Sequence, residues 1–141
     1  MNEQPTSPDK RAVVAVVSDG DNLLVIKRSQ AVIAPGKICF PGGRIEPGEP
    51  VEHALVREMQ EELNVEIETG GSLWQSVTPW GYEVHWLTAR LVGGELQANP
   101  DEVQWWRWMD RDAIEKHPDL LESNQAFFAA LAAGEFELPR D

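Results

Sequence analysis

Between Pro41 and Pro50 the chain reads PGGRIEPGEP, which is too rich in glycine and proline for a helix or a strand and therefore predicts a loop. After this loop, apolar residues recur every four positions, as they do on one face of an α-helix: Val51, Leu55, Met59 and Leu63. Pro50 suits the first helical position, and Asn64 tolerates the left-handed conformation that often follows a helix C-terminus. The sequence therefore predicts a helix that begins near Pro50, packs one face on a core and ends near Asn64.

Three glutamates share one side of this predicted helix. With about 100° of rotation per residue, Glu61 and Glu62 lie at about −60° and +40° from Glu58, so the three carboxylates occupy an arc of roughly 100° beside the apolar stripe. Like charges at these spacings destabilise a helix by roughly 0.2–0.5 kcal/mol per pair, and Arg57 is the only Lys or Arg within the helix. Taken alone, the pattern fits a solvated acidic face with Arg57 in a surface ion pair. The alternative is a cation site.

The spacing over residues 43–65 favours the cation site. Gly43, five residues, Glu49, seven residues and then REMQEELNV from Arg57 to Val65 resemble the Nudix box, a loop–helix–loop signature. Asn64 stands where the family pattern has glycine, a mild change because Asn also adopts left-handed geometry. The chain enters the box through Phe40–Gly43 (FPGG), and the resemblance extends over about residues 11–115.

The resemblance implies an α/β fold, namely a Nudix-type α/β/α sandwich with a mixed β-sheet and a loop–helix–loop catalytic motif. The residue patterns are compatible with this fold. Strands are expected at Ala12–Ser18, Asn22–Lys27, Lys37–Phe40, Leu73–Thr78, Glu83–Leu91 and Trp105–Met109, the first two as a hairpin. Short helices are expected after caps at Asp110 and Ser123, the second ending before Gly134. We expect a flexible N-terminal tail over residues 1–11 and a single domain over residues 12–141.

The resemblance also implies a divalent cation, Mg²⁺ with Mn²⁺ as a possible substitute. Mg²⁺ takes oxygen ligands in near-octahedral geometry, usually one or two carboxylates together with substrate phosphates and water. The implied metal ligands are carboxylates and glycine carbonyls: Gly42, Gly43, Glu49, Glu58, Glu61 and Glu62. Of these, Glu58 and Glu62 would be direct ligands, and Glu61 a ligand or a water-mediated contact. Glu49 also fits an ordinary helix cap, since it precedes the positive end of the helix.

The reaction implied is attack of water on a phosphorus atom, for which a carboxylate base is expected. Glu58 and Glu61 are candidates for the base within the box. Similar proteins often carry a functional Glu shortly before the last strand, which indicates Glu102 more than Asp101, although an exposed turn acid is the simpler interpretation of either. Arg57 is expected to orient the glutamates, so the catalytic candidates are Arg57, Glu58, Glu61 and Glu102.

Aromatic and basic residues near loops are the candidates for substrate contact. All six Trp lie in the second half of the chain, where a ring can stack on a base or fill the core. Trp80 and Tyr82 are favoured because they flank a loop, and Phe40 because it enters the box. Lys37 and Arg44 are the candidates for phosphate binding.

By resemblance, the reaction is hydrolysis of a phosphoanhydride bond in a nucleoside diphosphate linked to another moiety. The compact, MutT-like layout favours a nucleoside triphosphate pyrophosphohydrolase. An ADP-ribose or dinucleoside polyphosphate hydrolase is the alternative, because Pro79 and Tyr82 loosely match the markers of both types. A noncatalytic nucleotide-binding sensor with a Nudix fold is a further alternative. Loss of box glutamates would support it, but this chain retains all of them. An acidic helix that binds Ca²⁺ or nothing disagrees with the full spacing.

The net charge of the chain limits the molecules that it is expected to bind. The chain has 24 Asp and Glu against 12 Lys and Arg, a formal net charge of −12, which is unsuited to polymeric nucleic acid. Cys39 is the only cysteine, so an intramolecular disulfide is excluded. Apolar runs stay far below the roughly 20 residues of a membrane span, and no signal-peptide segment stands at the N-terminus. We therefore expect a cytoplasmic monomer or homodimer that binds a small nucleotide and no membrane.

Overall fold

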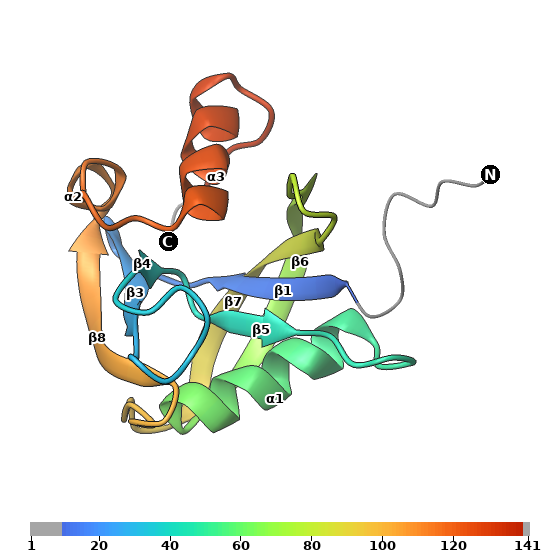
Figure 1. The fold of residues 1–141 in the computed structure, drawn as a ribbon, viewed down its shortest axis with the longest axis vertical. Helices are drawn as coiled ribbons and strands as arrows, with labels where there is room; N and C mark the ends of the chain where they lie inside the picture. The colour runs from blue at the N-terminus through green and yellow to red at the C-terminus, as the bar shows by residue number, and fades with distance from the viewer. Residues whose placement is uncertain (1–9, 140–141) are drawn as a thin grey trace.

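The computed structural model describes residues 10–139, which form two β-sheets held between helices (Figure 1). The first sheet has the strand order β5-β1-β7-β6. Its strands are β1 (Arg11–Val16), β5 (Gly42–Arg44), β6 (Val65–Val77) and β7 (Glu83–Gly94). This sheet is mixed, because β1 pairs antiparallel with β5 on one side and parallel with β7 on the other.

In the second sheet β3 is the common partner of the other strands. Its members are β2 (Ser18–Asp19), β3 (Asn22–Arg28), β4 (Ile38–Cys39) and β8 (Val103–Asp110). β8 pairs antiparallel along the whole of β3, whereas β2 and β4 pair with its two ends. The helices are α1 (Val51–Leu63), α2 (Arg111–Glu115) and α3 (Glu122–Ala132). None of the helices over residues 10–139 is long and apolar enough to cross a membrane.

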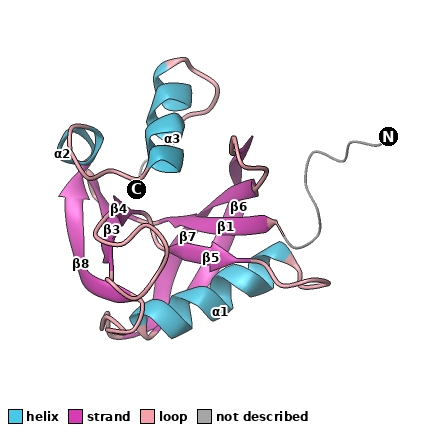
Figure 2. Ribbon diagram, in the orientation of Figure 1, coloured by secondary structure: helices cyan, strands magenta, loops and turns pink. Residues whose placement is uncertain are grey.

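The sheets form the middle layer of a sandwich (Figure 2). Alternate residues of β1 point to opposite faces, as strand geometry requires. Val13 packs in the core cluster that contains Leu55 and Met59 of α1, and Val16 packs in the cluster that contains Phe127 of α3. The expected α/β sandwich with a mixed sheet is therefore confirmed, with α1 on one face and α3 on the other.

α1 forms as its local pattern predicts. Leu55, Met59 and Leu63 are completely buried, so the four-residue spacing marks the face that meets the core. Pro50 is the N-cap residue, one position before the first helical residue. Asn64 ends the helix with φ 61°, the left-handed conformation predicted for it.

The expected hairpin over residues 12–27 is wrong for most of its first strand. Ser18 and Asp19 pair with β3, and the Val17 carbonyl accepts the Leu24 N–H at 2.9 Å, whereas β1 belongs to the other sheet. The physical reason is that β1 is apolar on both faces, which suits a strand in the middle of a sheet covered on both sides. The flexible tail was expected over residues 1–11, but Arg11 is already the first residue of β1. Residues 1–9 of the expected tail lie outside the described residues.

Three further boundaries differ from the sequence prediction. Gly42–Arg44, expected as a loop, is strand β5, and the strand expected to begin at Leu73 begins at Val65 instead. The cap expected at Ser123 is wrong, because Leu121 occupies the N-cap position of α3 without a side-chain cap. The Leu121 N–H is bonded to the Ile38 carbonyl at 2.9 Å, which holds the chain extended up to the start of the helix. Asp110 does cap α2 through the Ala113 N–H.

Candidate active site

A cleft of about 210 Å³ opens where α1 meets β5, the end of β3 and the start of β8. Its acidic lining comes from α1 and from the residue just before β8, and its basic lining from β3 and β5. These charged residues are Arg28, Arg44, Glu58, Glu62 and Glu102. Gly42 and Gly43 of β5 line it as well. Residues from distant parts of the chain therefore bring charges of both signs to one place.

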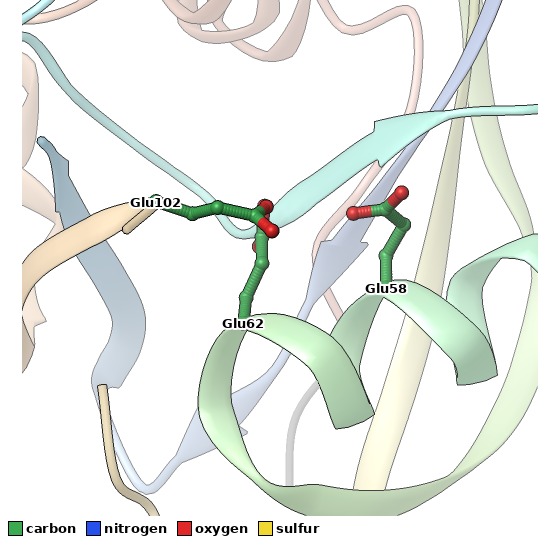
Figure 3. A group of neighbouring side chains, drawn as sticks. All are labelled: Glu58, Glu62 and Glu102. Atoms are coloured by element: carbon green, nitrogen blue, oxygen red, sulfur yellow. The ribbon is translucent and has the colours of Figure 1, made fainter. Parts of the chain in front are cut away.

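Three carboxylates converge in this cleft (Figure 3). Glu58, Glu62 and Glu102 each offer one oxygen atom, and the three atoms lie within 4.8 Å of one another. Glu58 and Glu62 are one helical turn apart on α1 and are only 8% and 6% exposed. The Gly42 N–H donates to Glu62 Oε1 at 3.2 Å, which ties β5 to the helix.

Burial makes this arrangement electrostatically unfavourable without a counter-charge. It raises the pKa of Glu62 well above its usual range, and the charges of Glu58 and Glu102 raise it further. Burial also raises the pKa of Glu58 to about 7, although Arg57 acts in the opposite direction. Buried charges persist when they are paired or bind a metal. A donor set made of carboxylate oxygens fits a hard divalent cation such as Mg²⁺.

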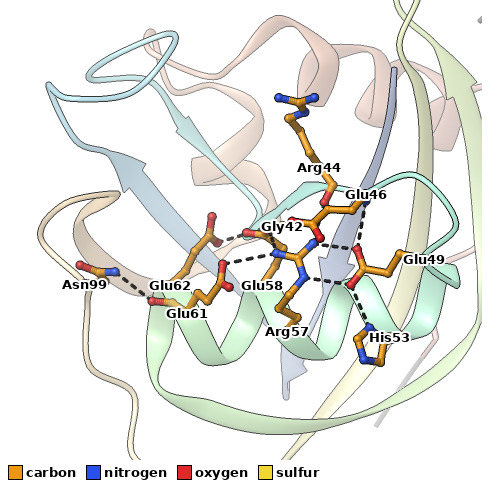
Figure 4. A network of polar contacts seen from close by, with 10 residues as sticks. All are labelled: Gly42, Arg44, Glu46, Glu49, His53, Arg57, Glu58, Glu61, Glu62 and Asn99. Atoms are coloured by element: carbon orange, nitrogen blue, oxygen red, sulfur yellow. Dashed lines mark hydrogen bonds and ion pairs between the residues drawn. The ribbon is translucent and has the colours of Figure 1, made fainter. Parts of the chain in front are cut away.

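Arg57 lies at the centre of a hydrogen-bond network beside the carboxylates (Figure 4). Its Nε and Nη2 donate to the two oxygens of Glu49, each at 2.9 Å. Nη1 donates to Glu58 at 2.9 Å and to Glu61 at 3.4 Å, and Nη2 also donates to the Arg44 carbonyl at 3.0 Å. These bonds hold the pKa of Glu49 far below its usual range and raise that of Arg57. One guanidinium therefore fixes α1, β5 and the intervening loop together.

The structure separates Glu49 from the three converging carboxylates. Besides Arg57, Glu49 accepts the Glu46 N–H at 3.0 Å and contacts His53 Nδ1 at 2.8 Å. Its oxygens are thus engaged by the loop and by the side chains of α1. These contacts are those expected of a residue that orients Arg57. Glu49 is not the helix cap, because Pro50 occupies the N-cap position of α1.

The other predicted acidic residues, Glu61, Asp101 and Glu102, lie in different environments. The Glu61 side chain is 48% exposed and contacts Arg57, and Glu61 belongs neither to the described lining of the cleft nor to the three converging carboxylates. Glu102 joins them, whereas its neighbour Asp101 is exposed. The turn before β8 therefore aims one of its two acids at α1.

The NUDIX domain family model matches residues 8–131, which is most of the chain. The chain belongs to the Nudix hydrolase family. Its relatives include the NAD-capped RNA hydrolase NudC of Stutzerimonas stutzeri, 30% identical over 108 residues that cover 76% of this chain and 38% of that protein. A putative 8-oxo-dGTP diphosphatase of Bacillus subtilis is 28% identical over 99 residues, covering 70% of this chain and 64% of that protein. The chain thus spans little more than a third of the length of the NudC protein.

Solved structures agree with the fold of this Nudix hydrolase. The MutT protein from Methanosarcina mazei superposes with a TM-score of 0.74 at 20% identity, covering 90% of this chain and 95% of that one. An ADP-ribose pyrophosphatase from Streptococcus suis superposes with a TM-score of 0.69 at 20% identity, covering 94% and 96%. At this identity the likeness concerns the fold.

The predicted substrate contacts of the Nudix hydrolase lie in different places. Arg44 lines the cleft, but Phe40 is 2% exposed and packs edge-on against Phe127 at 5.2 Å in the core. Trp80 is 52% exposed, and Tyr82 packs against the cluster on the α3 face, so both lie apart from the described lining of the cleft. Lys37 is also absent from that lining. The structure therefore leaves Arg44 as the predicted contact nearest to the carboxylates.

Sequence reasoning missed Arg28, the last residue of β3. Its side chain lines the cleft, and its Nε donates to the Ile33 carbonyl at 2.7 Å, which fixes the guanidinium at the cleft wall. The available signal was a cation at the end of a strand whose next loop leads into the box.

A larger cavity of about 930 Å³ lies elsewhere in the Nudix hydrolase. It is lined by β2, the middle of β6 and the segment that follows α3, and its described lining contains none of the three converging carboxylates. Its acids and bases partly neutralise each other, as in the ion pair between Arg90 and Glu68. Among the described residues, the group of carboxylates that could hold a metal ion lies in the smaller cleft.

Proposed function

We propose that this Nudix hydrolase uses Mg²⁺ to hydrolyse a phosphoanhydride bond in a nucleoside diphosphate derivative, with a nucleoside triphosphate as the preferred substrate. The observation that carries the proposal is the convergence of Glu58, Glu62 and Glu102, whose oxygens lie within 4.8 Å of one another in a partly buried cleft. We assign the metal to these carboxylates, with the carbonyl of Gly42 or Gly43 as a further ligand. Mn²⁺ is expected to replace Mg²⁺.

Bound Mg²⁺ would neutralise phosphate oxygens and lower the pKa of the attacking water. Arg28 and Arg44 line the same cleft, where each can donate to phosphate oxygens of the substrate. Arg57 keeps Glu58 in place through the bond to its Oε2 at 2.9 Å. The water proton passes to a carboxylate, and the candidates are Glu58, Glu61 and Glu102. The base is the one whose Gln variant loses kcat but still binds Mn²⁺.

The names of the relatives support a shared substrate chemistry. They describe proteins acting on NAD-capped RNA, 8-oxo-dGTP and ADP-ribose. Each of these compounds contains a nucleoside diphosphate joined to another group. The net charge of −12 argues against a polymeric RNA substrate for this chain, which favours small nucleotides. ADP-ribose and dinucleoside polyphosphates are the alternative substrates.

The test is hydrolysis of a panel of nucleoside triphosphates, ADP-ribose, dinucleoside polyphosphates and nucleotide sugars with Mg²⁺. We expect Glu62→Gln to reduce kcat by about 10²–10³-fold, because it removes a charge that holds the cation. The matched control is Glu52→Gln, an exposed glutamate in the first turn of the same helix. Its activity is expected to equal that of the wild type.

Two outcomes would contradict the proposal. Full activity in Glu62→Gln would exclude the carboxylate site as the metal centre. Nucleotide binding without turnover of any compound, with either Mg²⁺ or Mn²⁺, would instead indicate a noncatalytic sensor with a Nudix fold.

A further inference from the structure

The C-terminal end of α1 is closed by the segment between β7 and β8. Helix-end carbonyls lack partners within the helix and need donors from elsewhere. The Gln97 N–H donates to the Leu63 carbonyl and the Asn99 N–H to the Glu62 carbonyl, each at 2.9 Å. The Asn99 side chain adds a third bond, from Nδ2 to the Glu61 carbonyl at 3.1 Å (Figure 4). Asn99 is therefore attached to the helix turn that carries two box glutamates.

Asn99 also organises the turn that leads into β8. Its Oδ1 accepts the Asp101 N–H at 3.1 Å. Its carbonyl accepts the N–H groups of Glu102 at 2.9 Å and Val103 at 2.8 Å. On the other side of the turn, the Glu102 carbonyl accepts the Ser29 N–H at 3.0 Å. The backbone of Glu102 is thus fixed between Asn99 and the end of β3.

The side chain of Asn99 takes part both in the bonds to α1 and in the bonds within the turn. The amide of Asn99 donates to α1 with its nitrogen and accepts from the turn with its oxygen. Glu62 and Glu102 come from different elements, so their mutual position depends on how the turn is attached to the helix. Without this amide, the attachment keeps the backbone bonds of Gln97 and Asn99 and the bond from Asn64 Nδ2 to the Glu95 carbonyl at 3.4 Å, none of which involves Glu102.

We propose that Asn99 is a positioning residue that sets Glu102 against Glu58 and Glu62, so that the three carboxylates meet at one cation. The inference rests on the proposed metal site. Its specific content is that Asn99 acts on metal binding through Glu102, in addition to any contribution to helix stability. Residues that orient metal ligands typically change metal affinity by about 10- to 100-fold when they are removed.

The experiment measures Mn²⁺ affinity of the whole chain without nucleotide, by calorimetric titration. We expect Asn99→Ala to weaken Mn²⁺ binding about 10-fold and Glu102→Gln to weaken it at least as much. In the double variant, Asn99→Ala should cause no further loss beyond that of Glu102→Gln, because the group through which it acts is already gone. Gln97→Ala is the matched control, since the exposed Gln97 bonds to the helix with its backbone alone, and its affinity should stay at the wild-type value.

A second variant covers the case in which Asn99→Ala fails to fold. Asn99→Asp keeps the acceptor for the Asp101 N–H, loses the donor to the Glu61 carbonyl and adds negative charge at the negative end of α1. It should weaken Mn²⁺ binding at least as much as Asn99→Ala. A lowered melting temperature with unchanged Mn²⁺ affinity would show a purely structural role and overturn the inference.

The remaining outcomes separate this inference from the proposed function. Losses that add fully in the double variant would overturn the inference, because Asn99 would then act independently of Glu102. Unchanged affinity in Asn99→Asp, with affinity lost in Glu62→Gln and Glu102→Gln, would overturn the inference alone. Unchanged affinity in Glu62→Gln would overturn the proposed metal site and the inference together.

Discussion

The backbone of Gly43 lies directly against the carboxylate of Glu58, so closely that a methyl group on its Cα would overlap the carboxylate atoms. The absence of a side chain at this position of β5 leaves room for one of the three converging carboxylates. Gly43 begins the loop–helix motif and Glu58 lies within its helix, so their contact brings β5 against α1.

Gly43→Ala is expected to displace Glu58 and to lower kcat at least about 10-fold, an effect of the size seen when a metal ligand is misplaced. Steady-state kinetics with Mg²⁺ measures the loss. Gly71→Ala is the control, because a side chain there would meet nothing within 4 Å and the site is remote on β6. Equal activity of the two variants would show that the contact has no catalytic consequence.

Arg57→Lys is expected to lower kcat about 10- to 100-fold even though it keeps the positive charge. A single ammonium cannot reproduce the planar fork that binds both oxygens of Glu49 while also holding Glu58. The control is Arg90→Lys, which changes an arginine in the exposed ion pair with Glu68. The kcat of both variants should be measured under the same conditions. Wild-type kcat in Arg57→Lys would mean that charge alone is needed at this position.

Glu49 should contribute stability that depends on pH. Its pKa is held far below the usual value by Arg57, so its contribution is complete above the unfolded value of about 4.3 and declines as the pH falls toward the folded pKa. Glu49→Gln is expected to lower the free energy of unfolding by about 2 kcal/mol near neutral pH. The difference from the wild type should shrink below about pH 4.

Urea denaturation of both proteins from about pH 3 to pH 8 measures this difference. The exposed Glu68, which is paired with Arg90, provides the control. Glu68→Gln should change stability by no more than about 1 kcal/mol. A Glu49→Gln difference that grows on acidification would contradict the assigned direction of the pKa shift.

Cys39 should be unreactive while the protein is folded. It is buried, and burial raises the pKa of its thiol to about 11, so only about one molecule in a thousand carries the reactive thiolate at pH 8. Iodoacetamide labelling followed by mass spectrometry is expected to modify Cys39 rapidly in concentrated urea and negligibly without it. Labelling at similar rates in both conditions would show that β4 opens readily.

Local signals were sufficient to predict α1. The spacing of Leu55, Met59 and Leu63, and the residues at its two ends, are properties of one short stretch of chain. The position of β1 could not be predicted in this way, because its parallel pairing with β7 depends on packing between distant segments. β5 was missed because glycine is a poor indicator of a strand, although a side chain at Gly42 would overlap the backbone of Val13.

In the site, too, local spacing predicted some features, whereas others depend on packing between distant segments. The helical spacing placed Glu58, Glu61 and Glu62 on one arc, but it could not show that β5 covers the side with Glu58 and Glu62 and leaves Glu61 exposed. Glu102 was selected over Asp101 by family resemblance, and the structure places it with the α1 acids. Arg28 was missed because a basic residue at the end of a strand is common, so that signal alone does not indicate a role.

The parallel pairing of β1 with β7 also determines when the site can form during synthesis. β1 leaves the ribosome before its register partners Glu83–Thr88, which emerge roughly 4 to 14 s later at typical elongation rates. Until then the apolar stretch AVVAV of β1 has an unpaired edge toward β7, a condition that favours association between nascent chains. The strand that pairs with Gly42 and Gly43 of the cleft therefore needs protection until β7 has been synthesised.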